Sequence, residues 1–324
     1  MRERLERYQV VAYLVAVLAG LLVGTRSPAL AESLAVGLWP LLGALLYATF
    51  TQVPLLALRR ALVNARFLSA AVLGHFVAIP LLVWLLVQGL PAEPALRLGV
   101  LLVLLVPCTD WFLSFTHLGG GDTPTAIAFT PLSLLLQLAL LPLYLWLFLG
   151  QAELAGLLQR ELLLAFGGLI LLPLAAAWLT ERWAAGRPRR ERGVAALGWL
   201  PVPLLALVLF VVAAGQVGQV REFLGLLLWL VPLFVAFLGA ALLLARWLAR
   251  AFRLPARQGR VLAFGFGSRN SFVVLPLALA LPAGLEMAVA VVVIQSLVEL
   301  VGMLAFLHLV PRLFPDAAQA AGTR

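Results

Sequence analysis

Cysteine, lysine and acidic residues are scarce in this chain of 324 residues. The only cysteine is Cys108, which excludes an internal disulfide and a metal site built from several thiolates. Lysine is absent, and charged residues make up 11% of the sequence. A soluble globular domain carries charge on about a quarter of its residues. The scarcity of charge therefore argues against a water-soluble protein.

Apolar residues take the place of the missing charge. They make up 64% of the chain, and the mean hydropathy is +1.07. They form long runs such as 67–90 and 223–244, which carry no polar stripe for water. Because a membrane helix needs about 17–25 apolar residues, these runs predict an all-α polytopic membrane protein that is surrounded by the lipid bilayer. A soluble bundle with a very large core is the alternative.

The formal net charge of +9 would suit a nucleic-acid-binding protein if the basic residues formed one patch. All 23 are arginines, however, and they lie in the short stretches between apolar runs, where membrane topology accounts for them. We therefore expect no nucleic-acid partner, and no cofactor is expected. An enzyme is not expected either, because Gly119-Gly120-Gly121 lacks the Lys and Ser/Thr of a phosphate loop and no hydrolase motif occurs.

Ten apolar runs are candidate membrane spans. If the N-terminus lies inside, 18 arginines fall in cytoplasmic segments and four in outside segments, and this bias predicts that both termini are cytoplasmic in the inner (plasma) membrane. The remaining arginine, Arg269, lies inside the ninth run. The runs cover roughly residues 9–25, 33–53, 67–90, 96–118, 124–150, 160–180, 194–216, 223–247, 260–281 and 285–311.

The first run has a second interpretation. Three arginines, a short apolar run and the Ala29-Leu30-Ala31 tripeptide resemble a cleavable signal peptide. We interpret the run as the first span instead, because the internal repeat described next needs it.

The basic loop 182–192 divides the chain into five spans and five spans. Because five is odd, the second half starts on the opposite side of the membrane, which is the arrangement of an inverted-topology repeat. The predicted organisation is a first repeat at 8–150, a segment at 151–193 with the start of the second repeat and the cytoplasmic basic loop, the inverted second repeat at 158–312, and a cytoplasmic tail at 313–324.

Spans four and nine each contain a predicted break. The first lies at Pro107–Asp110, because proline lacks an amide donor and disfavours helical geometry at the residue before it. The second lies at Gly265–Asn270, where Gly265 and Gly267 are expected to loosen the helix. Amides and carbonyls freed inside a membrane can bind substrate or ions. Two ordinary kinked helices are the alternative.

Three charged residues, Asp110, Arg269 and Glu299, lie inside predicted hydrocarbon. Each costs about 2.5–3.5 kcal/mol to insert, so such residues pair with one another and mark transport pathways. We expect a carboxylate to hold Arg269, and we favour Asp110 over Glu299 because both breaks should meet at mid-depth. A purely structural ion pair is the alternative interpretation.

Polar residues recur on one face of the span after each break. Thr130, Ser133 and Gln137 follow the first break, and Gln295 and Glu299, with Ser296 beside them, follow the second. Asp110 precedes Ser133 by 23 residues and Asn270 precedes Gln295 by 25. The predicted ion- or proton-coupling residues are therefore Asp110, Glu299, Ser133, Gln137 and Gln295.

These residues resemble the bile acid:sodium symporter superfamily and its arsenite-efflux branch. Pro107-Cys108-Thr109, Leu118 and Gly121-Asp122 are similar to the span-four motif of arsenite-efflux permeases. Ser296-Leu297-Val298-Glu299-Leu300 is similar to the Pro-Leu-Val-Glu-Val stretch of span ten. The resemblance covers nearly the whole chain in topology and is specific mainly in spans four and ten.

The resemblance implies a ten-span inverted-repeat fold. Spans four and nine would be broken and cross near the midplane, in a core domain that moves against a panel domain. It also implies that Cys108 takes part in transport. The chain departs from the arsenite-efflux pattern at Val273, where an acidic residue would fall, and at Asp110, where the family has a small apolar residue.

The first functional hypothesis is ion- or proton-coupled efflux (antiport) of arsenite or a similar trivalent metalloid, with Cys108 as a transient arsenic ligand, because soft thiolates select soft ions. The second is a sodium- or proton-coupled symporter of a carboxylated organic solute, with Arg269 on the carboxylate. A receptor or scaffold without transport is a third class. The predicted substrate-binding residues are Cys108, Thr109, Arg269 and Asn270.

Overall fold

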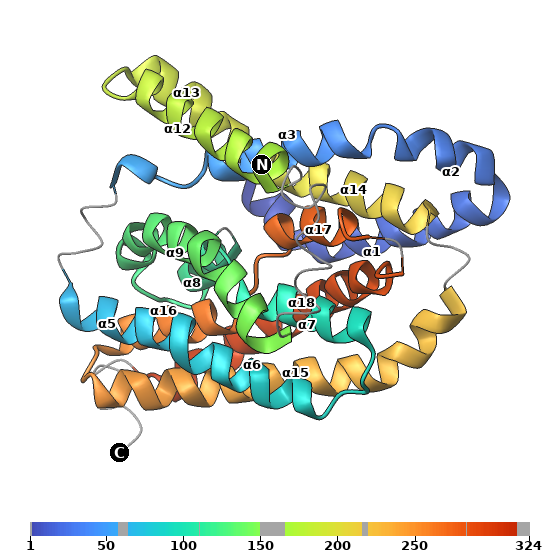
Figure 1. The fold of residues 1–324 in the computed structure, drawn as a ribbon. Coiled ribbons are helices and arrows are strands. Elements are labelled where there is room, and N and C mark those ends of the chain that lie inside the picture. The colour runs from blue at the N-terminus through green and yellow to red at the C-terminus, as the bar shows by residue number, and fades with distance from the viewer. Residues whose placement is uncertain are drawn as a thin grey trace.

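The computed structural model describes residues 2–57, 64–109, 111–149, 166–215, 220–282 and 284–315. Figure 1 shows a bundle of helices, and no strand occurs within these ranges. The predicted all-α class is therefore confirmed for the described residues.

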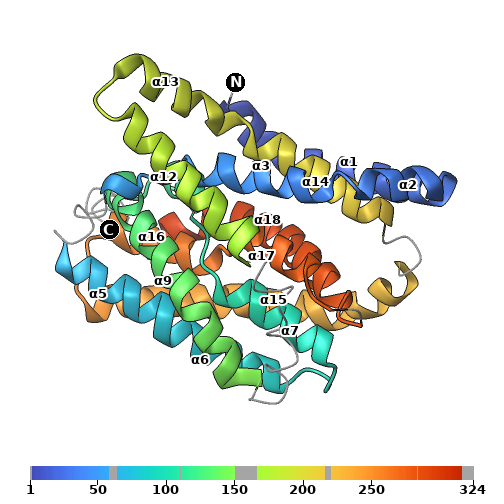
Figure 2. The same ribbon diagram turned by 45° about the horizontal axis from the view of Figure 1, so that its top comes forward.

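The helices form two layers, which are separated most clearly in Figure 2. The first layer contains α1 (Arg2–Arg26), α2 (Pro28–Ala35), α3 (Leu38–Phe50), α12 (Leu172–Ala184), α13 (Pro188–Ala196) and α14 (Pro201–Gly215). The second contains α5 (Ala65–Leu73), α6 (Ile79–Gln88), α7 (Pro94–Leu105), α8 (Trp111–Leu118), α9 (Thr123–Leu149), α15 (Val220–Ala251), α16 (Ala256–Gly267), α17 (Ser271–Leu279) and α18 (Met287–Leu313). The layers meet mainly where α17 lies against α3 and where α1 lies against α18.

Several helices in the described part are long and apolar enough to cross a membrane. There are five of them, and the bent pair α2 and α3, which meet at 51°, would make a sixth. The described parts of all ten predicted runs lie mostly in helices, but some runs are divided into short helices such as α7. The protein is thus a multi-pass helical membrane protein, and ten crossings stay a prediction.

The third predicted run contains a π-helical turn, Gly74–Ala78, between α5 and α6. A π turn disturbs the regular carbonyl pattern of a helix. Here the Tyr144 hydroxyl donates to the Phe76 carbonyl at 2.7 Å, so that α9 is bonded to this turn. A side chain at Gly74 would overlap the ring of Phe266. The turn therefore brings the third run close to α16.

Helices of the two halves repeat at nearly constant spacing. The bounds of α7 and α16 differ by 162 residues at both ends (256 − 94 and 267 − 105). Those of α9 and α18 differ by 164 (287 − 123 and 313 − 149). Two pairs of helices with spacings of 162 and 164 residues are what an internal repeat gives.

Candidate functional site: the crossing of two broken helices

The two predicted breaks lie against each other. Residues 106–109, after α7, and residues 268–270, between α16 and α17, are not helical, and Pro107 opposes Arg269 in an antiparallel bridge. The Cys108 amide donates to the Ser268 carbonyl at 3.2 Å, and the Asn270 amide donates to the Val106 carbonyl at 2.8 Å. The breaks at Pro107–Thr109 and Ser268–Asn270 are thus confirmed and contact each other, whereas their position at the membrane midplane stays a prediction.

The two breaks have different local causes. Val106 is extended (φ −105°, ψ 104°), as expected for the residue before Pro107. The expectation that Gly265 and Gly267 loosen span nine was wrong, because α16 stays helical through Gly267. A Cβ atom at Gly267 would lie 2.5 Å from the Met303 Cε atom. The glycine thus allows close packing against α18.

The bridge also corrects the alignment of the two halves. If the bridge partners Pro107 and Arg269 are equivalent positions of the two repeats, the next residues, Cys108 and Asn270, are equivalent as well. Asp110 is then not the equivalent of Asn270. Ser133 then follows Cys108 by 25 residues (133 − 108), and Gln295 follows Asn270 by 25 (295 − 270). With this alignment the polar residues of α9 and α18 fall at the same distance from their breaks.

Arg269 is fully buried at the crossing. Its Nη1 atom donates to the Leu104 carbonyl at 3.1 Å, and its Nη2 atom donates to the carbonyls of Gly265 at 3.0 Å and Phe266 at 2.6 Å. The guanidinium carbon also lies 5.4 Å from the centre of the Phe237 ring. The guanidinium therefore binds the C-terminal ends of both α7 and α16.

The carboxylate of Glu299 contacts the backbone of Arg269 rather than its guanidinium. Glu299 Oε2 accepts from the Arg269 amide at 2.8 Å and from Gln295 Nε2 at 2.6 Å. No ion pair between the guanidinium and a carboxylate is recorded within the described ranges. The alternative partner, Glu299, thus meets the Arg269 amide, whereas both Nη atoms of Arg269 donate to helix-end carbonyls. The favoured partner, Asp110, lies outside the described residues.

The contacts of Glu299 continue through α17 and α18. Gln295 Oε1 accepts from the Ser271 hydroxyl at 3.3 Å, and the Ser296 hydroxyl lies 2.7 Å from the Ser271 hydroxyl. Asn270 Oδ1 caps α17 by accepting from the Val273 amide at 3.2 Å. These side chains are all buried. We refer to Ser271, Gln295, Ser296 and Glu299 as the α18 cluster.

Thr109 and Asn270, two of the predicted substrate-binding residues, contact each other across the crossing. The Asn270 side-chain amide donates to the Thr109 hydroxyl at 3.2 Å, and both residues are buried. The structure thus brings together Thr109, Arg269, Asn270, Gln295 and Glu299.

The polar face of α9 differs from the α18 cluster. Thr130, Ser133 and Gln137 are buried, and the Thr130 hydroxyl donates to the Ala126 carbonyl at 3.0 Å. The side-chain polar atoms of Ser133 and Gln137 have no hydrogen-bond partner within the described part of the chain. Buried polar groups are usually paired, so these atoms are candidates for contact with an ion or solute.

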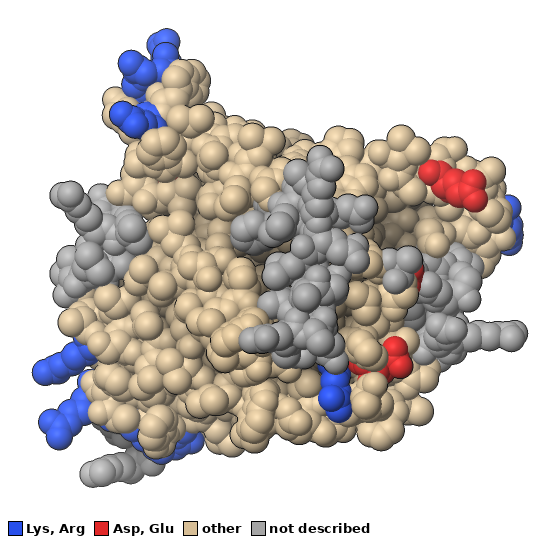
Figure 3. All heavy atoms as spheres, in the orientation of Figure 1, with Lys and Arg blue, Asp and Glu red and all other residues tan. Residues whose placement is uncertain are grey.

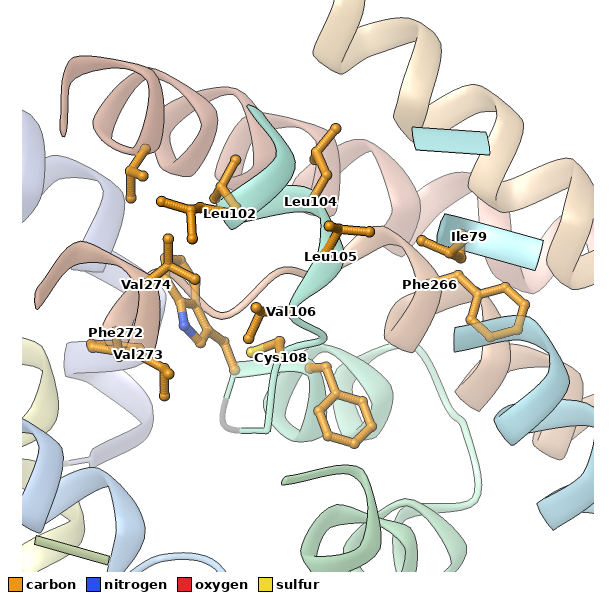
Figure 4. Packing of buried hydrophobic residues seen from close by; sticks show 14 of the residues in the cluster. Ile79, Leu102, Leu104, Leu105, Val106, Cys108, Phe266, Phe272, Val273 and Val274 are labelled. Atoms are coloured by element: carbon orange, nitrogen blue, oxygen red, sulfur yellow. The ribbon is translucent and has the colours of Figure 1, made fainter. Parts of the chain in front are cut away.

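Cys108 is 2% exposed. In Figure 4 its sulfur lies beside Val106, among labelled apolar side chains of both broken helices. This placement keeps the thiol next to the crossing but away from water.

The sequence did not single out Ser271, which bridges Gln295 and Ser296, and it did not indicate which residues His75 contacts. The His75 ring is buried, stacks on Phe129 at 5.6 Å and meets Phe266 edge-on at 4.8 Å. A signal for Ser271 existed in its place directly after Asn270. A signal for His75 was the glycine before it, in an otherwise apolar run.

A family model described as Sodium Bile acid symporter family matches residues 39–223. The match covers more than half of the chain and includes α7, the first break and α9. No curated protein matches the chain.

Proposed function

Because this chain belongs to the sodium bile acid symporter family, we propose that it is a sodium-coupled secondary transporter that moves an organic solute by alternating access between its two layers. The crossing of two broken helices beside buried polar side chains is the observation that carries this proposal. In transporters, unwound helices of this kind line the sites of substrate and coupling ion.

The proposed architecture is ten spans in two inverted five-helix repeats. The constant spacing of α7 and α16, and of α9 and α18, supports the repeat. The arginines support the orientation, because in Figure 3 basic side chains gather over the α12–α13 hairpin and at the end of the bundle where α5 begins. We therefore propose that this end and both termini are cytoplasmic in the inner membrane.

We place the sodium ion at the α18 cluster. Sodium is a hard cation and prefers oxygen ligands, and the cluster offers hydroxyl, amide and carboxylate oxygens within one buried region. Glu299 Oε1 is buried without a hydrogen-bond partner in the described chain. A sodium ion would satisfy this atom and neutralise the carboxylate. Ser133 and Gln137 are the matching groups of the first repeat, with Asp110 as a further candidate.

We place the solute where the layers meet at the crossing. Trp111 lies 6.1 Å from Tyr13 of α1 and 5.6 Å from Phe272, as measured between ring centres, so that both layers contribute aromatic surface there. Trp111 begins α8 and Phe272 is the second residue of α17, so the contact between their rings brings two helix N-terminal ends together, and such ends favour a negative group. These features support a carboxylated organic solute. Arg269 is a poorer candidate for the carboxylate, because its Nη atoms already donate to carbonyls.

The test is uptake of a panel of labelled carboxylated solutes into proteoliposomes with and without an inward sodium gradient. At least one solute should accumulate only with the gradient. Glu299→Gln should lower that uptake about tenfold or more, because interactions with a charged group typically contribute about 1.5–3 kcal/mol. Glu286→Gln is the control, since Glu286 is exposed and lies directly before α18. Sodium coupling would be contradicted if every solute that accumulates does so equally with and without the gradient.

Arsenite efflux is the second candidate, and the position of Cys108 favours it. The Cys108 amide binds the Ser268 carbonyl, and the Ser268 hydroxyl donates to the Met303 sulfur at 3.3 Å, so that two soft sulfur atoms lie near one residue of the crossing. Soft ligands select soft ions. Cys108→Ser should abolish arsenite resistance in a sensitive host without lowering expression. If the Cys108→Ser variant confers as much arsenite resistance as the natural chain, arsenite efflux through Cys108 is contradicted.

A further inference from the structure

The guanidinium of Arg269 binds equivalent atoms of the two repeats. Leu104 lies three residues before Pro107, and Phe266 lies three residues before Arg269, the bridge partner of Pro107. One guanidinium donates to both of these carbonyls, at 3.1 Å and 2.6 Å, and also to the Gly265 carbonyl at 3.0 Å. Pro107, the counterpart of Arg269, has no cationic side chain. A single cation thus serves the ends of two helices.

The ends of α7 and α16 need a positive charge. The last carbonyls of a helix have no partner within the helix, and they carry the negative end of its dipole. Here two such ends meet in a region where Leu104, Gly265 and Phe266 are all buried. Water cannot satisfy these carbonyls. In transporters with broken helices, C-terminal ends of this kind bind a monovalent cation.

We propose that Arg269 is a tethered cation that permanently fills a monovalent-cation site formed by the C-terminal carbonyls of α7 and α16. This site therefore takes no ion from solution, so an ion that couples transport would bind elsewhere. The inference goes beyond the proposed function, because it concerns an occupied site and does not depend on which solute is transported.

Arg260, the second buried arginine among the described residues, provides a comparison for the role of Arg269. Arg260 also binds carbonyls, those of Gly119, Gly120 and Phe314. Gly120 has φ +69°, and it lies in the turn between α8 and α9. Arg260 thus fixes a loop and the end of α18. Arg269 instead joins two helix ends inside the crossing.

The experiment removes the side chain and adds its charged group back. Arg269→Ala is purified in detergent in choline chloride without sodium or solute, and its thermal unfolding midpoint is measured. We expect a loss of roughly 5–10 °C, because the carbonyls of two buried helix ends lose their compensating charge. Guanidinium chloride at about 20 mM, far below denaturing concentrations, should restore at least half of the loss. Guanidinium chloride at this concentration should not raise the thermal midpoint of the natural chain.

Urea at the same concentration is the matched control, because it is planar, similar in size and donates from two NH2 groups but carries no charge. Urea should restore nothing. Equal rescue by urea would overturn the proposal, since the site would then need donors rather than a cation. A stable Arg269→Ala protein with an unchanged midpoint would overturn it as well, as would a variant that guanidinium does not rescue.

A second set of variants decides the question if Arg269→Ala does not fold. Arg269→Lys keeps a cation, Arg269→Gln keeps donors, and Arg269→Met keeps only bulk. The proposal requires the midpoints to rank Lys above both Gln and Met. A Gln or Met variant as stable as the Lys variant would refute it. All of these measurements are of thermal stability, and none involves transport. They can therefore refute the role of Arg269 without refuting the proposed function, and the uptake assay can refute the proposed function without refuting the role of Arg269.

Discussion

Gly265 lies between the crossing and the π-helical turn of the third run. A Cβ atom at this position would lie 3.1 Å from His75 Nε2 and 3.4 Å from His75 Cε1. The carbonyl of Gly265 also accepts from Arg269. The packing of His75 and the position of the Arg269 guanidinium therefore depend on the same residue.

We predict that Gly265→Ala destabilises the protein by about 1–3 kcal/mol, because overpacking a buried site has this cost. His75→Ala should be destabilising alone, because it leaves a cavity. The double variant should be less unstable than the sum of both changes, because the added methyl group then occupies part of the space left by the imidazole. A double-mutant cycle on thermal midpoints in detergent measures this coupling. Strict additivity would show that the imidazole does not limit the space at Gly265.

The sequence identified most of the residues at the crossing but not all of their contacts. Arg269 and Glu299 could be found because a charge inside an apolar run is costly and therefore conspicuous. The partners of the Arg269 guanidinium could not be found, because backbone carbonyls at a helix end have no residue type that marks them. The close contact between Gly265 and His75 was hidden for the same reason, since it joins parts of the chain that are far apart in sequence.

The pair α1 and α14 is the most extensive contact of the first layer. Gly20 lies where these helices approach most closely, since a Cβ atom there would overlap the Phe210 carbonyl oxygen and lie 3.0 Å from the Ala213 Cβ atom. A backbone oxygen in a helix cannot move unless the helix moves. The approach of α1 to α14 thus depends on the absence of a side chain at Gly20.

We predict that Gly20→Ala lowers the thermal midpoint in detergent by roughly 3–8 °C, as expected for about 1–3 kcal/mol of overpacking. Gly43→Ala in α3 is the control, because a Cβ atom there would meet nothing within 4 Å. That variant should be neutral or slightly more stable, because alanine favours a helix over glycine by about 1 kcal/mol. Equal effects of both changes would mean that α1 does not pack on α14 as described.

Helices were predicted well, and their ends less well. Long apolar runs predict helices because a membrane span requires internal backbone hydrogen bonds. The break at Pro107 was predictable because proline acts locally. The second break begins at Ser268, but the sequence predicted it to begin at Gly265. A glycine in an apolar run can either loosen a helix or allow close packing, and the sequence does not distinguish the two. Only contacts with His75 and Met303 distinguish the two roles.

The two layers are a property of the whole molecule that no single run predicts. They agree with the core and panel that the family resemblance implies, and the crossing lies within the second layer. The layer membership mixes distant parts of the chain, since α3 packs on α12 and α14. A local apolar pattern carries no information about such partners.

The two ends of the bundle should lie on opposite sides of the membrane. We predict that cysteines at Glu32 and Glu93 react with a membrane-impermeant maleimide in right-side-out vesicles. Cysteines at Arg189 and Arg250 should react only in inside-out vesicles, because the arginine-rich end is retained in the cytoplasm. All four positions are exposed, whereas Cys108 is buried, so the natural chain is the blank. The fully reversed pattern would contradict the orientation alone. Reaction of all four cysteines from one side would contradict the placement of the ends across the bilayer, and with it alternating access between the layers.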